Sequence, residues 1–312
     1  MSLHLRKKRY LLSGRHSWYT SRLAHIALFA VLAALVIFGI IHYRNKSASI
    51  PSVSGIYEDW KESRYKDVYS KSAIVLSKRP LDGEMLALKG FAAYYLFSAQ
   101  TDTAEAQGYL TDSIVSLRNA WYRVASGEKP KIAYILGKAY FHRGFYYADL
   151  AMKYLQFARD AGITYPDLPE FIGLTADVLG NNETAIASFT EALSVNPSDL
   201  LLFTLSRSYQ KAGNVDKAKQ YLSETIRVSG DELLQNKCRY EIGMILIAEG
   251  KVDEAETEFN TILEKEPNSA DAQYGLGVVC ETRGDLVKAR AAWRRALRIN
   301  PVHEGARQKM NI

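Results

Sequence analysis

Residues that could carry out chemistry are few and widely separated in this sequence. Four of its six histidines lie within the first 42 residues, and none belongs to a set with the spacing of metal ligands. The His303-Glu304 pair lacks the second histidine, four residues on, that a zinc-binding helix requires. The sequence also has no GxxxxGK[ST] phosphate loop, GxGxxG turn or GxSxG nucleophile elbow. We therefore predict that the chain is not an enzyme and needs no metal or other cofactor.

The two cysteines, Cys238 and Cys280, are too few for a disulfide framework. They occupy different register positions of two neighbouring predicted helices. We interpret both as small buried apolar residues and not as a redox pair.

The positive charge of the chain is confined to its ends. The net charge is +6, but residues 1–46 hold eight Lys and Arg and no Asp or Glu. Without those eight, the 32 remaining basic residues face 34 acidic ones, so the rest of the chain is slightly acidic. Nucleic-acid binding depends on neutralising phosphates, so it is the least favoured function.

An apolar segment, Leu23–Tyr43, follows this basic tail. Its 21 residues carry no formal charge, and as a helix they would be about 31 Å long, which matches the hydrocarbon core of a bilayer. The segment predicts a transmembrane helix. A cleaved secretory signal and an organellar targeting sequence are the alternatives, but the segment is longer than a signal core, and Arg44 and Lys46 separate it from the nearest small residues.

The flanking charges predict the orientation of this span. Six Lys and Arg precede it, against Arg44 and Lys46 directly after it. The positive-inside rule then keeps residues 1–22 in the cytoplasm and places everything after Tyr43 across the membrane. The cluster from Arg6 to Arg9 would be an accessory contact with anionic lipid.

A 34-residue period dominates the C-terminal part of the sequence. Gly243, Gly250, Ala255, Phe259 and Pro267 recur as Gly277, Gly284, Ala289, Trp293 and Pro301. Further upstream, Gly213 and Gly180 continue the series of Gly250 and Gly284 at spacings of 37 and 33 residues. A glycine that tolerates positive φ can end a first helix, and a proline ends a second. Each period therefore predicts a helical hairpin with a glycine turn.

These residues resemble the tetratricopeptide repeat family, whose unit is a helix–turn–helix of 34 residues. The resemblance implies an all-α fold, in which a transmembrane helix precedes a right-handed α-solenoid of hairpins. Residues 49–82 keep mainly a second helix, RYKDVYSKSAIVLSKRP. The predicted parts are a basic cytoplasmic tail (1–22), the transmembrane helix (23–43), a linker (44–54), divergent repeat-like hairpins (55–129), five repeats (130–165, 166–198, 199–235, 236–269 and 270–303) and a short C-terminal cap (304–312).

The resemblance also implies a concave groove, lined by the first helix of each hairpin, that binds protein or peptide segments. Carrying the ligand-facing positions over to this sequence gives mainly aromatic residues with two cations, which is typical of a surface for a protein segment. The alternative is that several of these rings pack between neighbouring helices. The positions are Tyr134, Lys138, Phe141, Phe171, Phe203, Arg207, Tyr240, Met244 and Tyr274. None reproduces the carboxylate clamp of relatives that bind chaperone C-termini.

The last helix predicts a basic end to the array. Residues 283–312 carry eight Lys and Arg against Asp285 and Glu304, whereas residues 47–282 carry 24 against 32. The segment 304–312 is too short for a full capping helix, so this end is interpreted as a solvated cap shielded by charge. The alternative is a contact with an acidic partner or with a second copy of the chain.

The sequence as a whole predicts a single-pass protein of a bacterial cytoplasmic membrane with a periplasmic repeat domain. Its expected function is a non-enzymatic scaffold for protein–protein interaction, in the assembly of a cell-envelope or periplasmic flagellar-motor complex. The association with such complexes rests on layout alone. One alternative is a periplasmic chaperone that holds unfolded clients in the groove, and another is an organelle receptor that faces the cytosol.

Overall fold

The computed structural model describes the backbone of residues 15–47 and 50–311, and the side chains of residues 25–41 and 50–311. Within these residues all regular structure is helical, which confirms the predicted all-α class. The α-helices are α1 (Arg15–Ser47), α2 (Val53–Lys61), α3 (Tyr65–Lys78), α4 (Gly83–Ala99), α5 (Thr103–Trp121), α6 (Lys129–Arg143), α7 (Ala148–Asp160), α8 (Leu168–Val178), α9 (Asn182–Val195), α10 (Asp199–Lys211), α11 (Val215–Val228), α12 (Glu232–Ala248), α13 (Val252–Lys265), α14 (Ala270–Thr282), α15 (Leu286–Ile299) and α16 (Glu304–Met310). Two 3-10 turns, Ser126–Glu128 and Phe145–Tyr147, precede α6 and α7.

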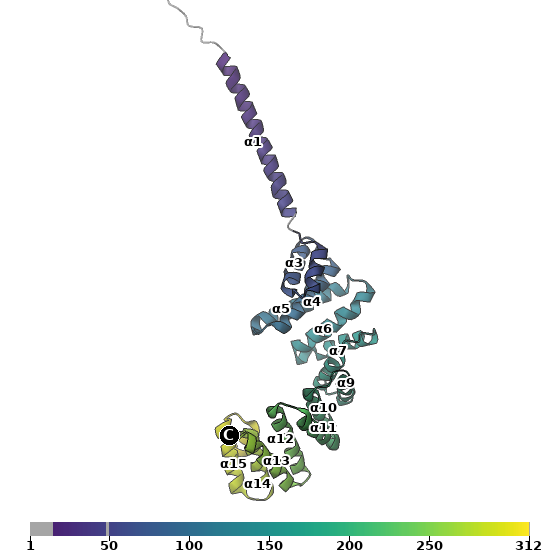
Figure 1. The fold of residues 1–312 in the computed structure, drawn as a ribbon, viewed down its shortest axis with the longest axis vertical. Coiled ribbons are helices and arrows are strands. Elements are labelled where there is room, and N and C mark those ends of the chain that lie inside the picture. Colours follow the sequence, from purple (N-terminus) through teal and green to yellow (C-terminus); the bar gives the residue numbers. More distant parts are fainter. Residues whose placement is uncertain (1–14, 48–49, 312) are drawn as a thin grey trace, which may run out of the picture.

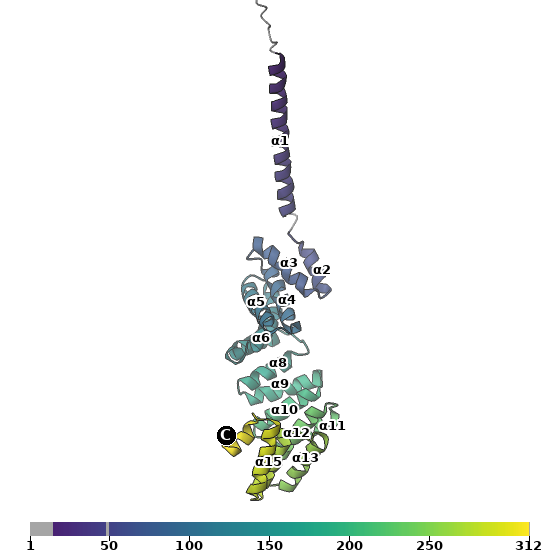
Figure 2. The same ribbon diagram turned by 90° about the vertical axis from the view of Figure 1, so that its left-hand side faces the viewer.

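The helices from α2 to α15 pair in chain order into antiparallel hairpins, the first of which is α2/α3 and the last α14/α15. Each hairpin packs on the next, so the hairpins form a stack that runs along the chain (Figures 1 and 2). Such a stack buries its apolar surface only between neighbours.

The four predicted turn glycines end the first helices of their hairpins. Gly180, Gly213, Gly250 and Gly284 have φ between +74° and +83°, a region that other L-residues rarely adopt. The residue after each glycine is the N-cap of the second helix of the hairpin. At three of the four turns this residue is Asn or Asp, whose side chain accepts a hydrogen bond from a backbone N–H of the new helix.

Close packing between the two helices of a hairpin depends on a second glycine position. A Cβ atom added at Gly277 would lie 2.1 Å from Nε1 of Trp293, and one at Gly243 would lie 2.6 Å from Cε1 of Phe259. Trp293 and Phe259 are almost completely buried. A small residue in the first helix therefore packs directly against a large one in the second.

The first hairpin is more complete than the sequence predicted, because α2 supplies the first helix that was not recognised in residues 49–82. Its turn contains Ser63 in place of glycine, with φ +56°. The next residue, Arg64, has φ −80° and ψ 62°, close to the values of Asn181 and Asn214 after the turn glycines. The turn geometry is kept although the glycine that marks it is missing.

Replacing Ser63 by glycine should therefore stabilise this hairpin. A residue other than glycine in the left-handed region costs about 1 kcal/mol or more, and Ser63→Gly removes that cost. Hydrogen exchange of α2 and α3 in the full-length protein should slow about five-fold. The same substitution at Ser70, which is exposed within α3, should destabilise by about 1 kcal/mol because glycine disfavours helix. Faster exchange in Ser63→Gly would contradict the assignment of the turn.

The helix α1 extends beyond the predicted span at both ends, and the linker between α1 and α2 is shorter than predicted. All described side chains of α1, from His25 to Ile41, are exposed. Among the residues that the structure describes, no helix is both long and apolar enough to cross a membrane. The predicted span, Leu23–Tyr43, reaches past the part of α1 whose side chains are described. The predicted lipid contact at Arg6–Arg9 lies outside the described residues.

The C-terminal end differs from the expected charge-shielded surface, because residues 304–310 form the short helix α16 on the last hairpin. Ala306 is fully buried there, and Met310 packs beside Trp293 and Leu297. His303 begins α16: its Nδ1 accepts a hydrogen bond of 3.0 Å from the N–H of Ala306. A two-turn helix therefore covers part of this end.

Candidate functional site

A large cavity lies between the first helices of hairpins one to three, α2, α4 and α6. Its volume is about 710 Å³. A smaller aromatic cavity of about 180 Å³ shares Trp60, Phe91, Lys131 and Tyr165 with it. We call the two together the aromatic cleft. Its lining residues are Tyr57, Trp60, Glu84, Ala87, Leu88, Phe91, Tyr95, Arg123, Val124, Ala125, Glu128, Lys131, Ile132, Tyr134, Ile135 and Tyr165.

Packed rings form the apolar wall of the aromatic cleft. The ring centroid of Trp60 is 6.1 Å from that of Phe91 and 5.8 Å from that of Tyr95. Tyr95 also stacks on Tyr65, with centroids 4.6 Å apart. Offset and edge contacts of this kind hold aromatic rings in fixed positions. The wall is therefore organised before anything binds to it.

The polar rim of the aromatic cleft carries both signs of charge. Lys131 forms an ion pair of 3.3 Å with Glu128, and Tyr57 donates a hydrogen bond to Glu84. Burial and this bond raise the pKa of Tyr57 to about 12, so its hydroxyl is a donor at neutral pH. Arg123 donates to the backbone carbonyl of Asn119 at 2.6 Å. Because the charges balance, the rim favours neither a strongly acidic nor a strongly basic ligand.

Three family profiles of the tetratricopeptide repeat match the chain, over residues 171–199, 201–228 and 240–304. These stretches contain the hairpins with glycine turns described above. The chain therefore contains tetratricopeptide repeats. Nothing among the curated proteins matches it. Arrays of such repeats offer extended concave surfaces to other proteins and are typically non-enzymatic, so protein–protein interaction is the function class of this one.

Solved repeat structures resemble the chain in fold. The C-terminal part of a tetratricopeptide repeat-containing protein from Cytophaga hutchinsonii is 15% identical, with a TM-score of 0.57 over 82% of this chain and 98% of that one. MamA is 21% identical, with a TM-score of 0.44 over 55% and 91%. MamA from residue 41 to its end, from Desulfovibrio magneticus RS-1, is 15% identical, with a TM-score of 0.48 over 58% and 99%. At 15% identity, the likeness to the Cytophaga hutchinsonii protein shows the fold alone.

Four of the predicted groove residues come together at the joint between repeats three and four. Nζ of Lys138 lies 2.6 Å from Oδ2 of Asp167 and 4.6 to 5.3 Å from the ring centroids of Phe171, Tyr134 and Tyr94. The hydroxyl of Tyr134 donates to Asp167, and burial together with this bond raises the pKa of Tyr134 far above its ordinary value. The rings of Phe141 and Phe171 pack edge to face, with centroids 5.6 Å apart.

This cluster is packed more tightly than a ligand-facing surface. Tyr134 is 7% exposed, and the side chain of Lys138 is 12% exposed with a carboxylate already bound to it. A cation surrounded by aromatic faces and a carboxylate is well stabilised where it lies. The cluster thus supports the neighbouring wall of the aromatic cleft, which Tyr134 and Tyr165 join with ring centroids 4.6 Å apart.

The other predicted groove residues are dispersed along the array. Phe203 is buried beside Leu222, with Nζ of Lys237 5.4 Å from its ring centroid, whereas Arg207 is exposed. Tyr240 packs on Phe259, and Met244 lines a shallow cavity of about 380 Å³. Tyr274 lies beneath α16, where its ring is 4.9 Å from that of His303. The structure does not unite these five into one cavity.

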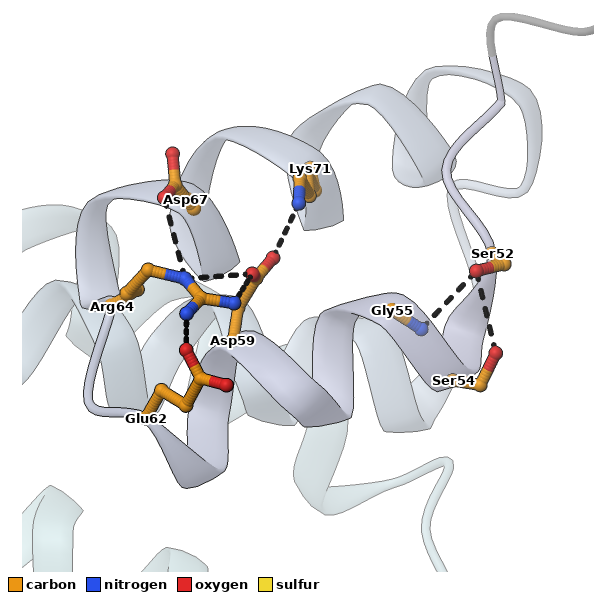
Figure 3. Close-up of polar contacts among 8 residues, drawn as sticks. All are labelled: Ser52, Ser54, Gly55, Asp59, Glu62, Arg64, Asp67 and Lys71. Carbon is orange, nitrogen blue, oxygen red and sulfur yellow. Dashed lines mark hydrogen bonds and ion pairs between the residues drawn. The ribbon is translucent and has the colours of Figure 1, made fainter.

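The helix α2, which carries Trp60, is held in place by a buried carboxylate. Asp59 is 3% exposed and binds Arg64 and Lys71, each at 2.6 Å (Figure 3). Arg64 also pairs with Glu62. At its other end α2 begins at Ser52, whose Oγ accepts a bond of 3.1 Å from the N–H of Gly55 (Figure 3). These contacts tie α2 to the turn and to α3, and so fix the outer edge of the aromatic cleft.

The Asp59 contacts predict a pH-dependent stability of the first repeat. Hydrogen bonds from Lys71 and then Arg64 lower the pKa of Asp59. A lowered folded-state pKa stabilises the fold above the unfolded value of about 4, and this stabilisation is lost as the pH falls through the folded value. Asp59→Asn should therefore lower the thermal midpoint, followed by tryptophan fluorescence, at pH 7. The difference in thermal midpoint between Asp59→Asn and the wild type should become smaller below about pH 4.

The matched control for this prediction is Asp216→Asn. The side chain of Asp216 is 98% exposed and its contact with Lys219 is 3.8 Å, so its loss should shift the midpoint little. A pH-independent gap between Asp59→Asn and the wild type would contradict the role of the Asp59 carboxylate.

Neither cysteine belongs to a reactive site. Cys238 is buried, and burial raises the pKa of its thiol to about 12. Cys280 is partly exposed, so its interpretation as a buried residue needs correction: it packs at the edge of the apolar cluster around Trp293 in the last hairpin. Among the described residues, no group of three or more His, Cys, Asp or Glu is placed to hold a metal ion.

Proposed function

We propose that this chain is a membrane-anchored scaffold whose aromatic cleft binds an extended segment of another protein. The observation that carries this proposal is the cavity of about 710 Å³ between α2, α4 and α6. A preformed cavity with an aromatic wall and a sparse polar rim is typical of a binding site.

The chemistry of the aromatic cleft favours apolar side chains on an extended backbone. Trp60, Phe91 and Tyr165 offer flat faces, and large rings in preformed pockets supply most of the binding energy in many protein interfaces. The rim supplies donors and acceptors, Lys131 and Glu84 among them, that a peptide backbone can use. A segment with two or three large apolar residues would therefore suit this surface.

Two features support the membrane anchor. Residues 25–41 of α1 are all exposed and uncharged, and the uncharged sequence extends from Leu23 to Tyr43. Exposed apolar surface on this scale calls for a non-aqueous environment or a partner. The excess of Lys and Arg before the segment supports a cytoplasmic N-terminus. The repeats would then act in the periplasm of a bacterium, in the assembly of an envelope or flagellar-motor complex.

Site-specific photocrosslinking tests the aromatic cleft. A photoreactive residue in place of Phe91, in full-length protein in its own membranes, should form a product with one stoichiometric partner. The same residue at Tyr146, which is 93% exposed and outside the cleft, should not. Many weak, substoichiometric products would instead indicate a chaperone that holds unfolded clients. Equal products at the two positions would reject the cleft as a binding site.

Protease accessibility tests the orientation. Protease added to right-side-out vesicles should digest the repeats from α2 onward, because in the proposed orientation they lie on the outer face of the cytoplasmic membrane. In sealed inverted vesicles the repeats should be protected. Digestion in the inverted vesicles alone would mean that the repeats face the cytosol.

A further inference from the structure

The last repeat leaves part of its surface uncovered, although α16 begins in the same way as a further first helix. Ser269 starts α14 by accepting a bond from the N–H of Ala272, and His303 starts α16 by accepting one from the N–H of Ala306. Both pairs are 34 positions apart, and both alanines are fully buried. The helix α16 therefore occupies the place of the first helix of an eighth hairpin.

This eighth first helix stops early. Met310, the last residue of α16, corresponds to Leu276 in α14, yet α14 continues to Thr282. The next residue, Asn311, is left-handed with φ +57°, a conformation that ends a helix. Relative to α14, α16 lacks its later turns. Leu286, at the start of α15, is 54% exposed, whereas Val215, at the same position of α11 and followed by the complete first helix α12, is 36% exposed.

Ion pairs at the two preceding junctions show what the missing turns would provide. The residue six positions after a turn glycine pairs with the residue just before the next turn glycine. Lys219 pairs with Glu249 in this way, and Glu256 pairs with Arg283 at 2.7 Å. The residue on the second helix is a cation at the first of these junctions and a carboxylate at the next. The corresponding residue of α15 is Arg290, so the next helix in the series should present a carboxylate to it.

Within the described residues, Arg290 has no ion-pair partner. Arg294 and Arg298 follow it at intervals of four residues, on the same face of α15. They are likewise exposed and make no ion pair in the described part of the chain. A groove of about 590 Å³ with an apolar floor runs beside them, and its lining residues are Ala291, Arg294, Arg295, Leu297, Arg298 and Met310. This end thus combines an apolar groove with cations that lack counter-charges.

We propose that this end of the array binds an acidic amphipathic helix of a partner protein, placed where the missing turns of the eighth first helix would lie. Its apolar face would cover Leu286 and Ala291, and a carboxylate would pair with Arg290 as Glu249 pairs with Lys219. Charge complementarity selects an acidic helix, because a basic or neutral one would leave the three arginines uncompensated. The site is separate from the aromatic cleft and does not depend on it.

The test is photocrosslinking from position 286 in the full-length protein in its own membranes, with the attachment point mapped by mass spectrometry. The expected attachment lies in a helical segment of a partner that carries net negative charge. Arg290→Glu should reduce the product at least ten-fold, since it replaces attraction by repulsion. Arg290→Lys should retain most of it, and Lys66→Glu, at an exposed position of α3, should retain all of it.

Several results would overturn this proposal. They are the absence of a product, attachment to a neutral or basic segment, attachment to a second copy of this chain, and a yield that Arg290→Glu leaves unchanged. Hydrogen exchange of α15 and α16 should be the same in Arg290→Glu as in the wild type, because Arg290 is exposed. Trp60→Ala should leave the product unchanged, which distinguishes this site from the aromatic cleft.

Discussion

Phe259→Ala should unfold the end of the array locally, with a loss of about 3–5 kcal/mol in the stability of the surrounding helices. Phe259 is completely buried and lies against two glycines from different repeats. A Cβ atom at Gly243 would be 2.6 Å from its ring, and one at Gly275 would be 2.5 Å from it. The ring therefore joins α12, α13 and α14, and its removal leaves a cavity where they meet.

Hydrogen exchange of the full-length protein measures this effect. Exchange in α12, α13 and α14 should accelerate by about a hundred-fold or more, which is what 3 kcal/mol corresponds to. Because each hairpin contacts only its neighbours, α2 to α5 should change little. Phe145→Ala is the matched control, since Phe145 is 69% exposed. An acceleration below ten-fold, or one spread evenly along the chain, would contradict this description of the packing.

Trp60→Ala should weaken binding of the partner captured from position 91 by about 2 kcal/mol or more, equivalent to about thirty-fold in Kd. Trp60 is the largest ring of the aromatic cleft and organises Phe91, Tyr95 and Tyr65 around it. Its truncation removes contact area and also loosens the wall. Titration of the purified partner segment into the full-length protein measures the change.

Two further variants separate binding from folding. Tyr165→Ala alters the same cleft from a loop position, where the ring is 41% exposed, and should also weaken binding while α2 and α4 keep their hydrogen-exchange rates. Tyr122→Ala removes a ring that is 82% exposed and lies outside the cleft, and should have no effect. If Tyr165→Ala and Tyr122→Ala bound the partner equally well, the cleft would not be the binding site.

The repeat period predicted the fold well where a specific backbone or packing requirement selects the residue. The turn glycines and the Gly277–Trp293 pair are such positions, because few other residues fit there. The first helix of the first hairpin escaped detection, because Ser63 adopts the glycine conformation and Ile56 stands where the other repeats have a small residue. The large residue of this hairpin, Ile56, is in the first helix, and the small one, Ser72, is in the second; both are buried. This is the reverse of the other repeats, so the usual sequence pattern is absent.

The candidate site was harder to predict than the fold. Tyr134 and Lys138 were selected as ligand-facing residues from the register of the family, but Asp167 and Phe171 from the next repeat enclose them. Such enclosure depends on how adjacent repeats approach, which a repeat pattern does not contain. Trp60, Phe91, Tyr95 and Tyr165 were missed, since three lie in the divergent hairpins and one in a loop. The spacing of Phe91 and Tyr95, four residues apart on one helix, was the available signal.

The most direct test of the central claim is a structure of the full-length protein with its captured partner. We expect an extended segment of that partner between α2, α4 and α6, with apolar side chains against Trp60, Phe91 and Tyr165. An empty aromatic cleft, with the partner bound elsewhere on the array, would contradict it.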